Sequence, residues 1–127
     1  PEITVVPLPL NHVEHYAPNE NIFYHLDTCL LYLKKINTFL VYFDSFQSEA
    51  IKTLQGIGFT LKVTKEDAES FVCNCVVAGD MIFAPIISGC LVKEFLVYNG
   101  FKILEHDMSE FLKSGGAVKC LSLEMRG

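Results

Sequence analysis

The sequence predicts an α/β protein in which a unit of strand, strand, helix and strand occurs twice. The helix-to-strand junction at Gly58-Phe59 recurs 42 residues later at Gly100-Phe101. Leu54, in the preceding helix, recurs at the same interval as Leu96. In both units, β-branched and aromatic runs surround one segment of helical periodicity. Such a unit cannot bury its own apolar face, so we expect the two to stack on each other and on further neighbours.

The first unit is expected over about residues 22–63. In its helix, Ala50, Ile51 and Leu54 fall on one face, and the glycine at position 56 ends the helical pattern. The predicted elements are a strand at 22–33, a turn at 34–37, a strand at 38–43, a helix at 47–55 and a strand at 59–63.

The second unit is expected over about residues 71–104, after a short helical turn that Thr64 can cap. Its predicted elements are a strand at 71–78, a turn at 79–80, a strand at 81–86, a helix at 89–98 and a strand at 101–104. Two more strands lie outside the units. One is expected at residues 2–8, where β-branched residues precede Pro9, and the other at about 119–124.

Length, composition and charge limit the class of protein. With 127 residues and 14.3 kDa, the chain is one domain or part of one, and half of its residues are apolar, which is enough for a core. The net charge of −5 argues against a nucleic-acid partner, which requires a basic surface. No apolar run is long enough to cross a bilayer, and the start at Pro1 has no basic segment of a signal peptide. We therefore expect a soluble protein without membrane contact.

The cysteines predict a cytoplasmic protein with free thiols. There are five, an odd number at irregular spacing, and no secretion signal accompanies them. Cys73 and Cys75 are too close for the usual pair of zinc ligands, so we expect them to pack in the core. His12 and His15 lie in a polar loop expected over residues 11–21, with no matching cluster of ligands nearby. Neither a metal site nor a cofactor is expected.

Two short motifs contain the residue types of thiol catalysis. A glycine pair, Gly115-Gly116, precedes Cys120 and allows a sharp turn with close approach of the backbone to a ligand. Near the start, His25 and Asp27 are two residues apart and would share one face of a strand. A cysteine, a histidine and a carboxylate together are typical of a nucleophilic thiol enzyme. The structural alternatives are a helix cap and a core cysteine for the first motif, and a sheet-edge histidine with a turn-capping aspartate for the second.

Together the two motifs resemble the guanidine-modifying (pentein) superfamily, which contains arginine deiminases, dimethylarginine dimethylaminohydrolases and amidinotransferases. Those proteins carry His-x-Asp on one strand and a glycine-rich turn before a C-terminal cysteine. The resemblance implies an α/β-propeller of five ββαβ units around a central site. About two full units are present here, so residues 1–127 would be the C-terminal part of a single pentein-like domain.

The resemblance also implies roles for single residues. Cys120 would attack the guanidinium carbon of arginine or a methylated arginine, giving citrulline through a covalent intermediate. His25 would serve as general acid and base, and Asp27 would bind the guanidinium. Asn74 would line the site as a substrate-binding residue, and the glycine pair would form the backbone turn beside it. The implied ligand is a small cationic guanidino compound, with no cofactor.

Parts of the family's site have no counterpart in this sequence. Its other guanidinium-binding carboxylates, and the arginine that holds the substrate carboxylate, belong to the first half of the domain. We therefore expect a missing N-terminal half or a complementing chain, and a homo-oligomer is also open. An amidinotransferase and a non-catalytic binding or assembly protein of the same fold are alternatives. A tautomerase with Pro1 as base is another, although its units would be β-α-β.

Overall fold

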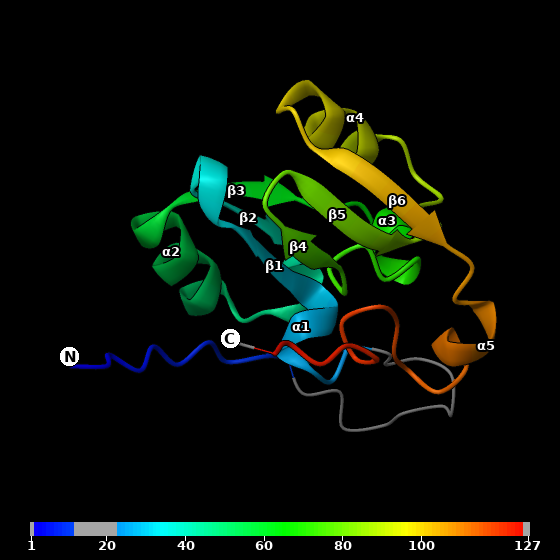
Figure 1. Ribbon diagram of the computed structural model, residues 1–127. Helices are drawn as coiled ribbons and strands as arrows, with labels where there is room; N and C mark the ends of the chain where they lie inside the picture. The colour runs from blue at the N-terminus through cyan, green and yellow to red at the C-terminus, as the bar shows by residue number, and fades with distance from the viewer. Residues whose placement is uncertain (1, 12–22, 126–127) are drawn as a thin grey trace.

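The computed structural model describes residues 2–11 and 23–125, and two three-stranded sheets form its centre (Figure 1). Each sheet pairs its first two strands antiparallel and its second and third strands parallel. The first sheet contains β1 (Leu30–Leu33), β2 (Thr38–Val41) and β3 (Phe59–Lys62), and the second contains β4 (Val76–Ala78), β5 (Met81–Pro85) and β6 (Lys102–His106). The order strand, strand, helix, strand is present twice, which confirms the predicted α/β fold class.

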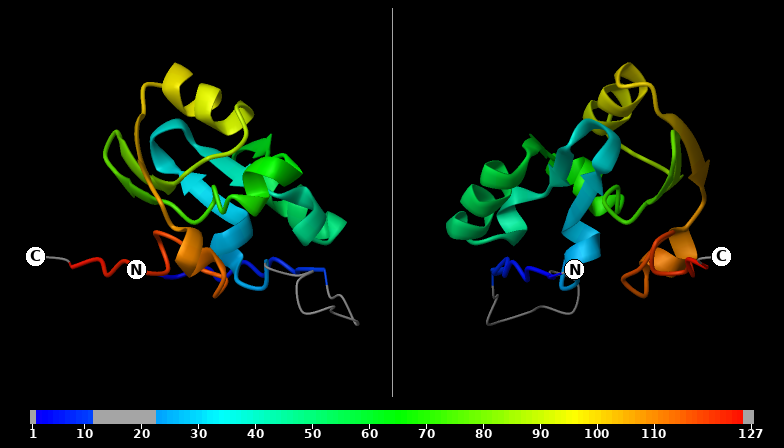
Figure 2. Two further views of the ribbon diagram at one scale, coloured as in Figure 1. Left: turned by 90° about the vertical axis from the view of Figure 1, so that its right-hand side faces the viewer. Right: turned by 60° about the vertical axis from the view of Figure 1, so that its left-hand side comes forward.

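One longer helix completes each unit, and the side views show the two helices well apart (Figure 2). These are α2 (Ser48–Ile57), between β2 and β3, and α4 (Leu91–Tyr98), between β5 and β6. The shorter elements are α1 (Leu26–Cys29), η1 (Lys34–Ile36), η2 (Phe43–Ser45), α3 (Lys65–Glu69) and α5 (Ser109–Leu112). Thr64 caps α3, as expected, because its hydroxyl accepts the N–H of Asp67 at 3.1 Å.

The core joins the two units because β2 is buried on both faces. Phe39 and Val41 pack in a smaller cluster that α2 completes with Ala50 and Leu54. Leu40, which points to the opposite face, belongs to a larger cluster that also includes residues of the second unit. That larger cluster contains Leu33, Leu40, Val63, Ala68, Val72, Cys73, Cys75, Ile82, Ala84, Ile87, Val92, Leu96 and Phe101. Cys73 and Cys75 are thus core residues, as predicted.

The strand expected at residues 2–8 is not formed. Residues 2–6 are exposed. The segment pairs with the rest of the described chain only at its end, through an isolated bridge between Leu10 and Phe46 and the hydrogen bonds of Pro9 and Asn11 to residues 44–47. A lone extended segment with no partner strand gains no ladder of hydrogen bonds, whatever its β-propensity. Pro1, His12 and His15 lie outside the described residues.

The strand expected at 22–33 begins only at Leu30, and α1 takes the place of its first half. The backbone N–H of Thr28 and its hydroxyl both donate to the carbonyl oxygen of His25, at 3.0 and 2.6 Å. These bonds close a helical turn. His25 and Asp27 therefore do not lie on one face of a strand, and that prediction was wrong.

Two other predicted strands are turns for part or all of their length. Of residues 71–78, only Val76–Ala78 forms a strand; Phe71 has a φ of 61°, and the amide of Asn74 returns to the Phe71 carbonyl at 2.9 Å. The strand expected at 119–124 is absent, because Leu121 N–H bonds back to Ala117 and the chain turns there. No helix in the described part of the chain is long and apolar enough to cross a membrane.

Candidate active site

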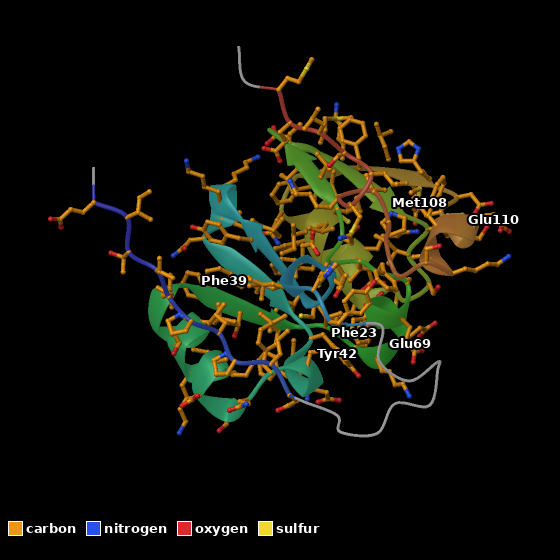
Figure 3. The ribbon with its side chains drawn as sticks, turned by 90° about the horizontal axis from the view of Figure 1, so that it is seen from below. Phe23, Phe39, Tyr42, Glu69, Met108 and Glu110 are labelled. Carbon is orange, nitrogen blue, oxygen red and sulfur yellow. The ribbon has the colours of Figure 1, made fainter. Side chains whose placement is uncertain are left out.

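The segment that carries His25 is held by aromatic packing immediately before it. Phe23 lies beside Tyr42 (Figure 3), with ring centroids 4.9 Å apart. The Phe23 ring centroid is 5.9 Å from that of Phe71. Phe23 thereby contacts both core clusters. His25 follows as the extended residue before α1, with its carbonyl oxygen bound by Thr28. The backbone of His25 is fixed while its side chain stays exposed.

Asp27 contributes a carboxylate to an open pocket. The pocket has a volume of about 530 Å³ and is lined by Tyr24, His25, Leu26, Asp27, Leu30 and Tyr32. Within the described ranges, the buried Oδ1 atom of Asp27 has no hydrogen-bond partner. A buried carboxylate oxygen without a donor is costly, so a donor group of a ligand would stabilise this arrangement.

The glycine pair shapes the turn that presents Cys120. Gly115 has a φ of 78°, in the left-handed region that favours glycine. A side chain at Gly116 would place its Cβ 3.1 Å from Cys120 Cβ and 3.4 Å from Cys120 Sγ, so the backbone approaches the thiol closely. Cys120 itself is exposed. The predicted turn is therefore present, but it leads into a further turn at Cys120 rather than into a strand.

Asn74 joins the two motifs. Its fully buried side chain donates from Nδ2 to the Asp27 carbonyl oxygen at 3.1 Å and to Cys120 Sγ at 3.2 Å. Its Oδ1 atom accepts the N–H groups of Ala117 at 3.0 Å and of Cys120 at 3.2 Å. Residues about 95 positions apart in the chain thus meet at one buried amide. Both donors and both acceptor positions of this amide are thus used within the protein, and its expected role in binding a substrate stays a prediction.

Tyr24 also lines the pocket, although nothing in the sequence distinguishes it beyond its position next to His25. The Tyr24 and His25 rings meet edge to face, with centroids 4.4 Å apart. The Oη atom of Tyr24 also lies 2.7 Å from where a Cβ at Gly115 would be. Tyr24 therefore makes a second connection between the histidine segment and the glycine turn.

Cys120 is exposed, whereas three of the other four cysteines are buried. Desolvation raises the pKa of the Cys29 thiol to about 12, and the nearby Asp27 carboxylate adds to this effect. Burial also raises the pKa of Cys75 to about 12 and that of Cys73 well above its usual value. These thiols are protonated at neutral pH and inaccessible, whereas Cys90 and Cys120 are exposed. Cys90 lies just before α4, so Cys120 is the accessible thiol that adjoins the pocket motif.

No group of three metal-ligating side chains occurs among residues 2–11 and 23–125. The His25 imidazole and the Asp27 carboxylate line the open pocket, and the Cys120 thiol shares the Asn74 amide with the main-chain carbonyl of Asp27. This set suits nucleophilic attack on a cationic or polarised carbon, followed by proton transfer.

Comparisons with known proteins agree with this chemistry. No family model matches the chain. It is 39% identical over 107 residues to the bifunctional arginine dihydrolase/ornithine cyclodeaminase ArgZ of Synechocystis. The aligned region covers 81% of this chain and 15% of ArgZ. It is 34% identical over 122 residues to the N(G),N(G)-dimethylarginine dimethylaminohydrolase of Mycobacterium tuberculosis, covering 95% and 39%. The chain thus spans well under half the length of these relatives.

The fold is also similar to that of a solved structure. The product-bound N-terminal domain of ArgZ, a cyanobacterial arginine dihydrolase, superposes with a TM-score of 0.80 and 34% sequence identity. The match covers 93% of this chain and 41% of that domain. A variant of the same domain, covalently bound to a reaction intermediate, matches with a TM-score of 0.79.

Proposed function

This chain belongs to the pentein superfamily, and we propose that it is the cysteine-bearing part of a guanidine hydrolase that converts arginine or a methylated arginine to citrulline. One observation carries the proposal above all others. Asn74 Nδ2 lies within hydrogen-bond distance of both the Asp27 carbonyl oxygen and Cys120 Sγ, so the two motifs form one site. The named relatives are hydrolases, which favours water over an amine as the final acceptor.

The reaction would begin with the Cys120 thiolate attacking the guanidinium carbon. A C–S bond forms, and the carbon becomes tetrahedral. Its collapse breaks one C–N bond and releases ammonia or an alkylamine, with His25 supplying a proton to the leaving nitrogen. Water, deprotonated by His25, then adds to the thiouronium carbon and the C–S bond breaks. Citrulline and the free thiol result.

Asp27 would orient the substrate for this attack. A carboxylate and a guanidinium pair through parallel charge-assisted hydrogen bonds, and the Oδ1 atom of Asp27 has no donor within the described residues. Leu26, Leu30 and Tyr32 line the same pocket and would contact the apolar part of the ligand. Productive geometry depends on such positioning, because the reacting atoms must be held close together.

A further segment would have to close the site. The pocket beside Asp27 is open, and water exclusion strengthens electrostatic stabilisation of the transition state. We propose that another part of the same protein, or a second chain, supplies this cover together with the groups that bind the substrate carboxylate. The fraction of the relatives' length that this chain spans supports the proposal.

Paired cysteine variants test the function. The native protein that contains this chain is incubated with arginine, monomethylarginine and dimethylarginine, and citrulline and released amine are measured. Cys120→Ser should abolish citrulline formation, because a hydroxyl is a far weaker nucleophile than a thiolate. Cys90→Ser is the matched control, since that thiol is also exposed but lies just before α4. Its turnover should equal that of wild type.

The covalent step has its own readout. Acid-quenched protein should carry the substrate-derived adduct on the peptide that contains Cys120, detected by mass spectrometry. Turnover that survives in Cys120→Ser, or an adduct on a different cysteine, would rule out this mechanism.

A further inference from the structure

We propose that Asn74 is a positioning residue for the thiol, with its side-chain amide both fixing the Cys120 turn and donating a hydrogen bond to the sulfur. The proposal rests on the function proposed above, since it assigns Cys120 as the reacting group. It replaces the substrate contact expected from the sequence with a role that acts through Cys120.

The orientation of the amide follows from its partners. Ala117 and Cys120 each present a backbone N–H, at 3.0 and 3.2 Å, and these donors require an acceptor. The Asp27 carbonyl, at 3.1 Å on the other side, requires a donor. Only one orientation of the amide satisfies all three, with Oδ1 toward the turn and Nδ2 toward Asp27. In this orientation the second Nδ2 proton is available to Cys120 Sγ at 3.2 Å.

The backbone around Asn74 holds that side chain in place. The Asn74 carbonyl accepts the N–H of Lys119 at 3.1 Å, which adds a fourth hydrogen bond with the Cys120 turn. The turn that precedes Asn74 contains Phe71, a bulky residue with a φ of 61°, in a region that costs free energy for such a residue. Phe71 is nevertheless almost completely buried and packs against Phe23, so packing maintains the unfavourable conformation.

The contact with sulfur gives the amide a chemical effect beyond its structural one. An N–H donor binds a charged sulfur more strongly than a neutral one, so this bond would stabilise the sulfur in the form that attacks the substrate. Because the side chain is fully buried, water does not compete for the donor. Cys29 shows the opposite environment, since burial and the adjacent Asp27 carboxylate disfavour its thiolate.

Two substitutions separate the structural effect from the chemical one. In Asn74→Asp, one carboxylate oxygen can still accept the Ala117 and Cys120 amides, but the other cannot donate to the sulfur and repels a thiolate. Asn74→Ala removes all four contacts. Asn99→Ala is the matched control, because the Asn99 amide also donates to a backbone carbonyl, that of Phe95 at 2.8 Å, but at the end of α4.

The principal readout is the rate at which iodoacetamide alkylates Cys120 at neutral pH, with Cys90 in the same sample as the reference. We expect the rate at Cys120 to fall about three- to tenfold in Asn74→Asp and Asn74→Ala, because both lose the N–H donor to the sulfur. Asn99→Ala should match wild type. A purely structural role would leave the rate unchanged or raise it, since Cys120 is already exposed. An unchanged or faster rate in Asn74→Asp therefore overturns the proposal.

A measurement on the unsubstituted protein keeps the proposal testable if the variants fold poorly. Alkylation of Cys120 should shift the NMR signals of the Asn74 side-chain amide and leave those of Asn99 in place. Unmoved Asn74 signals would contradict the contact.

Neither readout requires turnover, so the two proposals can fail separately. Slower alkylation without any citrulline formation would support Asn74 and refute the hydrolase. Citrulline formation with an unchanged alkylation rate would support the hydrolase and refute the role of Asn74. In an active protein, kcat should fall in Asn74→Asp while KM stays within about twofold, because the amide acts on the nucleophile and not on the substrate.

Discussion

At the Cys120 turn, two adjacent glycines are required for different steric reasons. Gly115 adopts a φ of 78° and lies against the Tyr24 hydroxyl, whereas Gly116 lies against the cysteine side chain. Tyr24 in turn meets the His25 ring edge to face. A change at Gly115 should therefore be transmitted to His25 through a single intervening side chain.

We expect Gly115→Ala to reduce turnover more than it reduces stability. The left-handed φ costs alanine about 1 kcal/mol, and the new Cβ would displace the Tyr24 hydroxyl, which lies 2.7 Å from its position. Citrulline formation and the free energy of unfolding in denaturant measure the two effects. Gly56→Ala is the control, because Gly56 lies in α2 with no atom within 4 Å of the added Cβ. Full activity in Gly115→Ala would separate Tyr24 from the function of His25.

At the scale of elements, one carboxylate ties the second sheet to its helix. Glu105 on β6 accepts the N–H of Ile87 at 2.9 Å and pairs with Lys93 of α4 at 2.9 Å. The hydrogen bond from Ile87 is the main cause that lowers the pKa of Glu105, and Lys93 lowers it further. The folded state therefore prefers the ionised carboxylate more than the unfolded chain does.

The stability contributed by Glu105 should depend on pH. A lowered pKa in the folded state means that the contribution is complete above the ordinary pKa of a glutamate and is lost as pH falls through the lowered value. We expect Glu105→Gln to be less stable than wild type at neutral pH, with the difference shrinking in acid. Denaturant unfolding at several pH values measures this. Glu94→Gln, a change at an exposed position on α4, is the control and should show no such trend; a constant deficit for Glu105→Gln would contradict the assignment.

Elements with a clear period could be predicted from the sequence, and elements fixed by distant contacts could not. The helices at α2 and α4 and the strands around them follow from apolar spacing and glycine stops, which are local signals. Residues 71–75 and 119–124 also contain apolar residues, yet they turn because Asn74 binds the backbone of Ala117, Lys119 and Cys120. Those bonds join residues more than 40 positions apart, and no local pattern encodes them.

Local sequence patterns were also insufficient to predict the geometry of the candidate site. His25, Asp27 and Cys120 could be selected because a thiol, an imidazole and a carboxylate suit one reaction. The expected geometry of His25 and Asp27 was wrong, since the β-branched Thr28 closes a helical turn instead of continuing a strand. Tyr24 could not be selected at all, because its contact with Gly115 exists only after folding.

For the molecule as a whole, the site is built where the two repeated units meet. His25 and Asp27 lie just before β1, the first strand of the first unit, and Asn74 lies just before β4, the first strand of the second. The Cys120 turn, after the last strand, closes against both. Catalysis in the proposed sense would thus depend on the relative placement of the units, which the shared core determines.

That shared core predicts that the two units unfold together. Leu96 of α4 is fully buried in the cluster that also contains Leu33 and Leu40 of the first unit. Leu96→Ala should therefore cost about 2–5 kcal/mol and reduce the hydrogen-exchange protection of amides in β2 and in β5 by the same factor. Val97→Ala is the control, because it removes methyl groups from an exposed neighbour; it should change neither the stability nor the hydrogen-exchange protection. A loss of protection confined to β5 would show that the first unit stays folded by itself. The placement of Asp27 relative to Cys120 would then depend on Asn74 and its neighbouring turn rather than on the common core.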